Sequence, residues 1–515
     1  MKTTSDLLWQ LVRSLSSNEK LFFKRNFSGS NLPGHRIYLK LFDSIASQKK
    51  YDEEMILKKM APALHKKNIA SQKHYLYRQV CASLLQYENR DSVTHGIYND
   101  ILLIRIYRKK GLLDEAHRLW KKAVIKARQT ESFAFLNLLK NEFGKMILFS
   151  GSHTRYDELL SIFKSNIISY DEYIEMITLR DIYTETLLLK RKAHFDMDES
   201  LRDKIGGLLR LVIETEMRYS GHSFWFHHYL WMNKATLLYL ENDIDSSLAL
   251  LKQTWKEWKK NPDYLKTNSE YYIELLYMIN YAGILHGSYQ YVEDIFNDSL
   301  NAMVGEAQRA NFEAIKYLAL NKIYNKTARY TDVEKLVGFM KAKYKQWEPV
   351  LNADLNRTLN LSLGIASFVL EKYNDAFYFT KRGLAYFRDG AREEHASVAN
   401  LLLLLITYSL NNARLFDAQY RSTYFYFNKR QKKHPFETAL VQCLHRTFYM
   451  KDPAGKKAYY QRTLSLLEKS KDDPVQQMMF NIFNYPGWLS SRIQRIPYRE
   501  FVRKNISLTL TDQVA

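Results

Sequence analysis

Two stretches of the chain, about 260 residues apart, share one pattern of apolar and polar positions. Each of them, Leu102–Ala127 and Leu361–Phe387, contains an apolar run, a short polar turn and a second amphipathic run. The matching positions of the second runs are Ala116, Leu119, Trp120, Ala123, Val124 and Ala127 in the first stretch, and Ala376, Phe379, Thr380, Gly383, Leu384 and Phe387 in the second. Steps of three and four residues place these side chains on one face of an α-helix. Each stretch is therefore predicted to be a pair of helices that must stack on neighbouring pairs to bury its apolar faces.

The turn between the two runs recurs along the chain at a nearly constant interval. The eight turn sites begin at Leu113, Tyr156, Met197, Ile244, Tyr289, Tyr330, Tyr373 and Leu415, and successive sites are 41 to 47 residues apart. Acidic residues suit these sites, because each precedes a helix N-terminus, which carries partial positive charge. The interval predicts an array of helix pairs over residues 96–470, ending in a looser ninth pair at Glu437–Met450 and Gly455–Lys469.

Small and aromatic residues stand at corresponding places in the two best stretches. The small ones are Ala116 and Ala123 in the first stretch and Gly364, Ala376 and Gly383 in the second, and the aromatic ones are Tyr107 and Trp120. In these positions the units resemble tetratricopeptide repeats, although their interval exceeds that family's period of about 34 residues. The resemblance implies an all-α fold, a right-handed α-solenoid of antiparallel helix pairs.

Residues 1–95 are expected to form helices without this interval. Ser16 and Glu19 form a capping-box pattern ahead of the run Lys20–Phe27, in which each side chain binds the other residue's backbone N–H. Further helices are expected near residues 36–47, 52–60 and 70–87. We interpret the segment as a helical cap on the array, and its basic balance leaves a helix-turn-helix-like module open.

Residues 471–515 form a basic C-terminal helix and tail in this interpretation. The sequence Tyr485-Pro-Gly-Trp488 predicts a turn, and the basic run after it places Trp488, Ile493, Ile496 and Phe501 on an inward face. From Ile506 onward a helical pattern is lacking, and an extended end is expected.

Composition narrows the class of protein. The 515 residues include only 9 Pro and 18 Gly, too few for a loop-rich β architecture. Cys81 and Cys443 lie among apolar residues and are interpreted as buried thiols in a reducing compartment. The amino terminus lacks a signal-peptide pattern, and the longest apolar run, Leu401–Ile406, is far shorter than the ~20 residues that span a bilayer. We therefore expect a cytoplasmic protein that does not enter a membrane.

The net charge of +21 is concentrated at the two ends of the chain. Residues 1–90 hold 16 Lys and Arg against 7 Asp and Glu, and residues 421–515 hold 17 against 7. The long middle holds 43 against 41. An anionic partner would therefore meet the ends of the chain before the middle.

Sequence patterns of catalysis are lacking. The chain contains no GxGxxG or GxxxxGK[ST] phosphate loop, no GxSxG nucleophile elbow and no HExxH zinc motif. His222, His227 and His228 form the densest histidine group, but adjacent histidines on a helix diverge by about 100° and no nearby carboxylate completes a metal site. We expect no enzyme activity, no catalytic or metal-binding residues and no cofactor.

Two groups of residues are candidates for binding. The first is asparagine on the first helix of a pair: Asn280 and Asn321 lie nine residues before their turn tyrosines, and Asn233 lies eleven before Ile244. The tetratricopeptide resemblance implies that first helices line a concave groove, where asparagine can hold an extended peptide's backbone. The alternative is that these asparagines face solvent or serve helix packing. The second group comprises possible anion or nucleic-acid contacts at Lys429, Arg430, Lys432, Lys433, Arg492, Arg495, Arg499 and Arg503, for which a solvated helix face is the alternative.

The leading functional hypothesis is a non-enzymatic scaffold that holds a peptide or protein segment in the groove of the array. The alternative is a regulatory protein that associates with nucleic acid or the ribosome through its basic ends. The partner and the oligomeric state remain open at this point.

Overall fold

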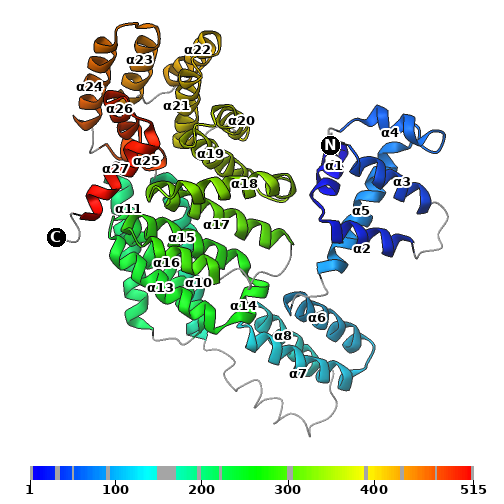
Figure 1. The fold of residues 1–515 in the computed structure, drawn as a ribbon. Coiled ribbons are helices and arrows are strands. Elements are labelled where there is room, and N and C mark those ends of the chain that lie inside the picture. Colours follow the sequence, from blue (N-terminus) through cyan, green and yellow to red (C-terminus); the bar gives the residue numbers. More distant parts are fainter. Residues whose placement is uncertain are drawn as a thin grey trace.

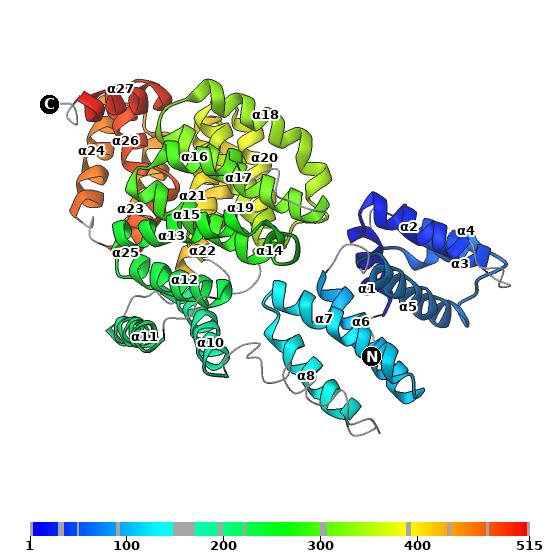
Figure 2. The ribbon, with the colours of Figure 1, turned by 90° about the horizontal axis from the view of Figure 1, so that it is seen from below.

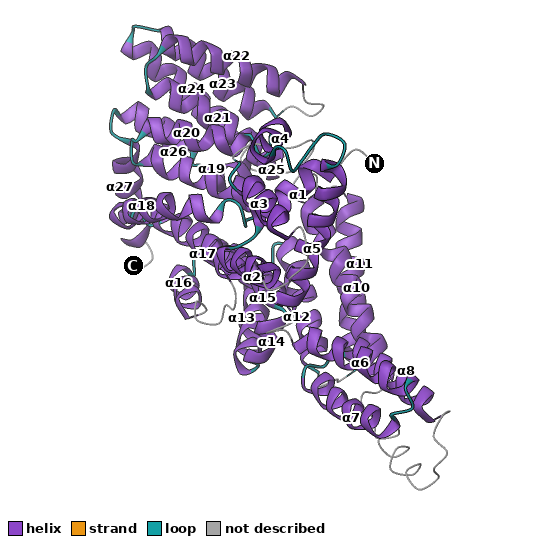
Figure 3. Ribbon diagram, turned by 90° about the vertical axis from the view of Figure 1, so that its right-hand side faces the viewer, coloured by secondary structure: helices purple, strands orange, loops and turns teal. Residues whose placement is uncertain are grey.

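The computed structural model describes residues 4–28, 35–48, 51–88, 93–147, 170–193, 199–219, 223–298, 306–387, 393–429, 434–469 and 473–511. Within these ranges every regular element is a helix (Figure 3). Consecutive helices pack side by side and the pairs stack along the chain (Figure 1). The protein is therefore an all-α solenoid, as expected.

The first five helices form a bundle with a core of its own. They are α1 (Thr4–Ser14), α2 (Ser17–Ser28), α3 (His35–Ala46), α4 (Glu53–Met60) and α5 (Ile69–Glu88). Leu8, Phe23 and Phe42 lie in this core with exposed fractions of 2% or less. The predicted capping box is present: the Ser16 backbone N–H donates to Glu19 Oε2 at 2.6 Å, and the Glu19 N–H donates to Ser16 Oγ at 3.2 Å.

The helix pairs follow. Their helices are α6 (Val93–Lys109), α7 (Leu113–Gln129), α8 (Phe133–Ile147), α10 (Tyr170–Ala193), α11 (Glu199–Arg218), α12 (Phe224–Leu240), α13 (Ile244–Lys260), α14 (Pro262–Thr267), α15 (Ser269–His286), α16 (Tyr289–Asp298), α17 (Glu306–Lys326), α18 (Tyr330–Trp347), α19 (Ala353–Val369), α20 (Tyr373–Leu384), α21 (Glu393–Ser409), α22 (Ala413–Lys429), α23 (Pro435–Tyr449) and α24 (Pro453–Lys469). Five of the predicted turn residues are the first residues of α7, α13, α16, α18 and α20. Leu415 lies in the first turn of α22, and the sites at Tyr156 and Met197 lie outside the described residues.

The turns share one backbone geometry. Two positions before the second helix stands a residue with a left-handed φ: Gly111 (78°), Asn242 (67°), Gly287 (84°), Ala328 (53°), Glu371 (60°) and Asn411 (53°). In the first five of these turns, the residue that follows the left-handed one donates its backbone N–H to the carbonyl of the residue five positions before it, at 2.8–2.9 Å. This is the Schellman ending, which satisfies the last free carbonyls of the first helix. The same tight turn therefore recurs along the array and sets the angle between the first and second helix of each of these pairs.

Two large clusters of buried side chains run through the array. The first extends from Phe133 to Phe379, and the second from Leu361 to Leu489. Helices α6 to α8 enclose a smaller cluster around Trp120, whose indole N–H donates to the Leu139 carbonyl at 2.8 Å.

The C-terminal helices fold back onto the middle of the array. They are α25 (Pro474–Ile482), α26 (Tyr485–Gln494) and α27 (Tyr498–Thr511). Tyr498 of α27 packs against both large clusters, and Val502 packs against the first. The guanidinium of Arg503 lies 5.8 Å from the centre of the Tyr330 ring at the start of α18. The array thus curves until its last helices touch its middle.

Two expectations for this region are wrong. The predicted turn at Tyr485 is the first turn of α26: Asn484 accepts the Gly487 N–H at 2.8 Å, and Pro486 stands in the first turn, where the missing proline N–H costs nothing. The expected extended end from Ile506 is instead helical to Thr511. Trp488, predicted to face inward, is fully buried.

Candidate functional site: a cavity on the first helices

The array contains a cavity of about 500 Å³. Its wall comes from the first helices of three successive pairs, α15, α17 and α19, with one residue of α21, and from the C-terminal helices α25 and α27. The backward fold of the C-terminal helices therefore turns part of an open groove into a cavity.

Each first helix presents one face to this cavity. On α17 the lining residues are Leu318, Asn321, Lys322, Asn325 and Lys326, and on α19 they are Asp354, Thr358, Leu361, Ser362, Ile365 and Val369. These steps of three and four residues describe one stripe of an α-helix. The second helices contribute little, Tyr330 at the start of α18 being an exception. The cavity therefore lies mainly on first helices of the pairs, whereas the implied concave groove remains a prediction.

Two of the three predicted asparagines lie on the cavity wall. Asn321 is 2% exposed, and its Nδ2 donates to Ser362 Oγ at 2.6 Å and to the Ser362 carbonyl at 3.2 Å, which joins α17 to α19. Asn280 is 7% exposed, and among the described residues its Oδ1 has no hydrogen-bond donor. A buried carbonyl without a donor is costly, so Asn280 carries an unsatisfied acceptor on a residue that lines the cavity.

Asn233 does not line this cavity. It is fully buried between α12 and α10, where its Nδ2 donates to the Leu179 carbonyl at 2.8 Å and its Oδ1 accepts from Thr186 Oγ1 at 3.2 Å. Both ends of the amide are satisfied within the protein. In the described structure this asparagine serves helix packing, which was the alternative interpretation.

Asn325 was not among the predicted residues. Its Nδ2 donates to the Asn321 carbonyl at 2.8 Å and to Asn321 Oδ1 at 3.0 Å. Its own Oδ1 is buried without a donor among the described residues. With Asn280, the cavity therefore holds two unsatisfied amide oxygens, which suit the N–H groups of an extended backbone.

Two lysines also line the cavity. Burial, together with the neighbouring ammonium of Lys326, lowers the pKa of Lys322 to about 8. Burial likewise lowers the pKa of Lys326. Carboxylates do not contribute to either shift. The one carboxylate on the cavity wall among the described residues, Asp354, is bound by Arg357.

The C-terminal helices contribute mostly apolar and aromatic side chains to the cavity, together with Asn481, Asn484 and Asn505. Phe480 and Phe483 come from α25 and the residue after it, and Phe501, Val502 and Ile506 come from α27. Tyr277 and Tyr281 of α15 add aromatic rings on the array side. Apolar walls with a few polar groups are typical of ligand cavities, whose volumes run from about 300 to 1,000 Å³.

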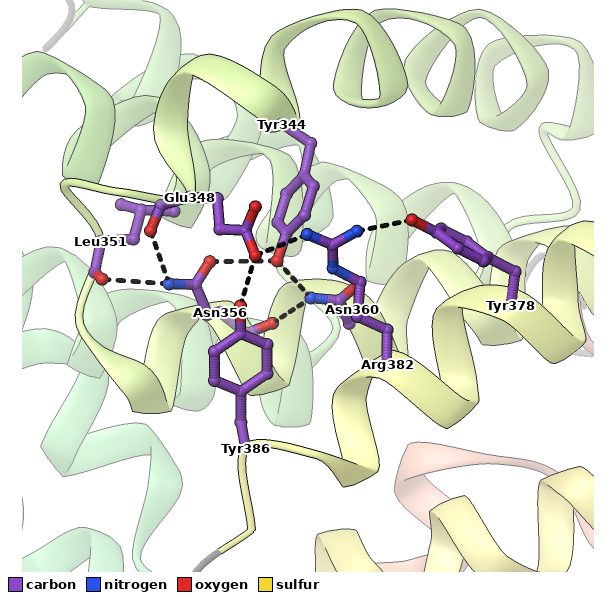
Figure 4. A network of polar contacts seen from close by, with 8 residues as sticks. All are labelled: Tyr344, Glu348, Leu351, Asn356, Asn360, Tyr378, Arg382 and Tyr386. Atoms are coloured by element: carbon purple, nitrogen blue, oxygen red, sulfur yellow. Dashed lines mark hydrogen bonds and ion pairs between the residues drawn. The ribbon is translucent and has the colours of Figure 1, made fainter. Parts of the chain in front are cut away.

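A separate polar network shows what asparagines do away from the cavity (Figure 4). Asn356 of α19 donates to the Glu348 and Leu351 carbonyls at 3.0 Å each. Asn360 donates to the Tyr344 hydroxyl at 2.6 Å, and that hydroxyl donates to Asn356 Oδ1 at 3.2 Å. These contacts fix α18 against α19.

The Glu348 carboxylate extends this network to α20 (Figure 4). It accepts from the Arg382 guanidinium at 2.5 Å and from the Tyr386 hydroxyl at 2.6 Å. Burial acts to raise the pKa of Glu348, but the hydrogen bonds from Tyr386 and Arg382 outweigh it, so that the pKa is lowered. The network holds two helix pairs together and has a structural role.

The predicted basic contacts are scattered. Arg492 lies over the Trp488 ring at 5.1 Å and Arg503 over the Tyr330 ring. Lys429, Arg495 and Arg499 are exposed, whereas Arg430, Lys432 and Lys433 lie outside the described residues. The bundle of α1 to α5 and helix α27 lie on opposite sides of the molecule (Figures 1 and 2). Nucleic-acid binding remains a prediction.

The histidine group has no arrangement for a metal. His227 stacks on Trp231 at 4.8 Å, and His228 is buried, with its Nδ1 accepting from the Trp258 indole at 3.2 Å; His222 lies outside the described residues. In the described ranges, no three His, Cys, Asp or Glu side chains gather as a metal site would need. Cys443 is buried as expected, whereas Cys81 is partly exposed.

The described helices also lack a membrane span, since none of them is both long and apolar enough to cross a bilayer. In comparisons with known proteins, no protein-family model and no curated protein matches the chain. Among solved structures, the chain is similar to the crystal structure of the apo form of RapI, with 14% identity, a TM-score of 0.45, and coverage of 75% of this chain and 98% of that one.

Proposed function

We propose that the protein is a non-enzymatic interaction scaffold that holds an extended segment of a peptide or protein partner in the cavity on its first helices. The observation that carries the proposal is the pair of buried amide oxygens, from Asn280 and Asn325, that line this cavity without donors in the described structure. An extended backbone offers N–H donors at regular spacing, and the apolar wall of α25 and α27 can receive alternate side chains. A divergent tetratricopeptide-like groove remains the interpretation of the array.

The proposal is tested by selection from a defined pool of acetylated, amidated hexapeptides. The full chain is incubated with the pool, and bound peptides are identified by mass spectrometry. We expect a related set of peptides to be enriched by the wild-type protein. The variant Thr358→Trp fills the cavity from α19 and is expected to lose the enrichment.

The matched control is Lys335→Trp, which adds the same side chain at an exposed position of α18 outside the cavity. It is expected to select the same peptides as the wild-type chain. Absence of enrichment by the wild-type chain would refute the proposal. Equal enrichment by Thr358→Trp and Lys335→Trp would place binding elsewhere on the array.

A further inference from the structure

The lysine pair of α17 gives the cavity a chemical preference. Lys322 and Lys326 are one helical turn apart, and both side chains line the cavity. Among the described residues, neither ammonium group has a carboxylate partner, and the neighbour that acts most clearly on Lys322 is another cation. Two partly buried positive charges without a counter-ion are unfavourable in the empty cavity.

The other ionisable groups of the cavity do not compensate this charge. They are Tyr277, Tyr281, Tyr330, Tyr498, Asp354 and His395. Burial raises the pKa values of Tyr330 and Tyr498, so these hydroxyls are neutral at physiological pH. Asp354 is bound by Arg357 on its own helix. Net positive charge therefore remains in a cavity whose C-terminal wall is mostly apolar and carries no charged side chain among the lining residues.

We propose that the cavity receives an anionic group of the bound segment, a carboxylate or a phosphate, between the ammonium groups of Lys322 and Lys326. This inference rests on the proposed function, because it specifies the segment that the groove holds. The segment carries one negative charge flanked by apolar side chains: the charge meets the lysine pair, its backbone N–H groups meet Asn280 and Asn325, and its apolar side chains meet Phe480 and Phe501.

Binding of such a group is linked to protonation. The pKa of Lys322 in the empty cavity is about 8, and its ordinary value is 10.5. A bound anion favours the charged amine, so binding takes up a proton near pH 8, and affinity falls as the pH rises above that value. If the anion restores the ordinary value, binding at pH 9.5 is about 30-fold weaker than at pH 7.

The test uses the full chain and four peptide pools that share uncharged flanking positions. The central residue is glutamate, glutamine or phosphoserine in three pools with blocked ends, and the fourth pool has a free C-terminal carboxylate and no other charge. We expect at least one anionic pool to bind about 10-fold or more tightly than the glutamine pool at pH 7. The preferred pool identifies the source of the anion.

Variants of α17 connect this preference to the lysine pair. Lys322→Met removes one of the two charges and is expected to weaken the anion preference strongly without loss of stability, since the charge it removes has no carboxylate partner among the described residues. Lys322→Arg keeps the charge, and should retain the preference while moving its pH midpoint upward. The matched control is Lys316→Met on the same helix: Lys316 contacts Asn297 at 2.9 Å, has a pKa lowered by burial, and does not line the cavity.

The outcomes are distinct. Equal binding of the glutamate, phosphoserine, free-acid and glutamine pools overturns the anion site and leaves the peptide groove standing. An anion preference that is undiminished in Lys322→Met, or that weakens equally in Lys316→Met, also overturns it. Failure of all four pools to bind overturns the proposed function together with this inference.

Discussion

The close crossing of α19 and α20 at Gly364 makes a sharp stability prediction. A Cβ atom at Gly364 would collide with Thr380 Oγ1 and lie 3.3 Å from both the Cβ and the backbone N of Thr380. The hydroxyl could rotate, but the Cβ and backbone contacts persist in any rotamer. We therefore expect Gly364→Ala to push the two helices apart.

The magnitude follows from two opposed effects. Replacing glycine by alanine within a helix stabilises it by about 1 kcal/mol. Forcing an extra methyl group into a packed contact costs about 1–3 kcal/mol, or more where backbone must move. The net expectation for Gly364→Ala is a loss of about 0–2 kcal/mol, and more if the backbone must move. Gly338 of α18 is the matched control, because nothing lies within 4 Å of its added Cβ, and Gly338→Ala should be stabilising.

The measurement is hydrogen exchange of α19 and α20 by mass spectrometry, together with urea unfolding of the full chain. Thr380→Ala should rescue Gly364→Ala by at least about 1 kcal/mol, because it removes the nearest atom. Thr380 Oγ1 is buried without a partner among the described residues, so Thr380→Ala alone should change the stability little. Stabilisation by Gly364→Ala equal to that of Gly338→Ala, or no rescue, would refute the close-crossing argument.

Three further predictions concern buried polar groups. Glu348→Gln should destabilise the array by about 1–3 kcal/mol at neutral pH. Because the folded-state pKa of Glu348 is lowered, the difference in stability from the wild type should shrink as the pH falls through that pKa. Urea titrations measure this difference, and a value that stays constant with pH would contradict the prediction. His228 is buried, and its pKa is lowered from 6.5 to about 3. Between pH 6.5 and 4.5 the imidazole binds a proton in the unfolded chain but not in the folded one, so the wild type should lose about 2–3 kcal/mol of stability that His228→Gln does not lose. Parallel pH profiles of the two proteins would exclude a neutral buried imidazole. Asn233→Ala should lower the stability by about 1–3 kcal/mol, because it leaves the polar groups bound to the amide without partners. Asn280→Ala should be nearly neutral in thermal unfolding. Equal losses of stability in the two variants would mean that both asparagines serve packing.

The array was predictable from sequence because its signals are local. The helix stripe depends on spacing within each helix, and the turn residues at Ile244, Tyr289, Tyr330 and Tyr373 begin their helices as expected. The left-handed turn residues were not predictable. Glycine favours that backbone at position 287, but Ala328 and Glu371 adopt it at a cost of about 1–2 kcal/mol, and only stacking of the flanking helices can enforce it.

The asparagines show how far spacing can specify a site. Asn280 and Asn321 lie nine residues before their turn tyrosines, whereas Asn233 lies eleven before Ile244. Two residues correspond to about 200° around a helix, so Asn233 faces the opposite side and is buried against α10. The shared nine-residue offset was therefore the informative signal, and residue type alone was not.

The lysine pair remained hidden for a different reason. Lys322 and Lys326 follow Asn321 and Asn325 by one position each, and in sequence they are typical of a solvated helix face. In the folded chain they line the same cavity as Phe480 of α25 and Phe501 of α27. That shared cavity depends on the accumulated curvature of the array, which brings residues some 150 positions later against α17. Each repeat specifies its own turn, but only the folded array places Lys322 and Lys326 on the wall of a cavity shared with α25 and α27.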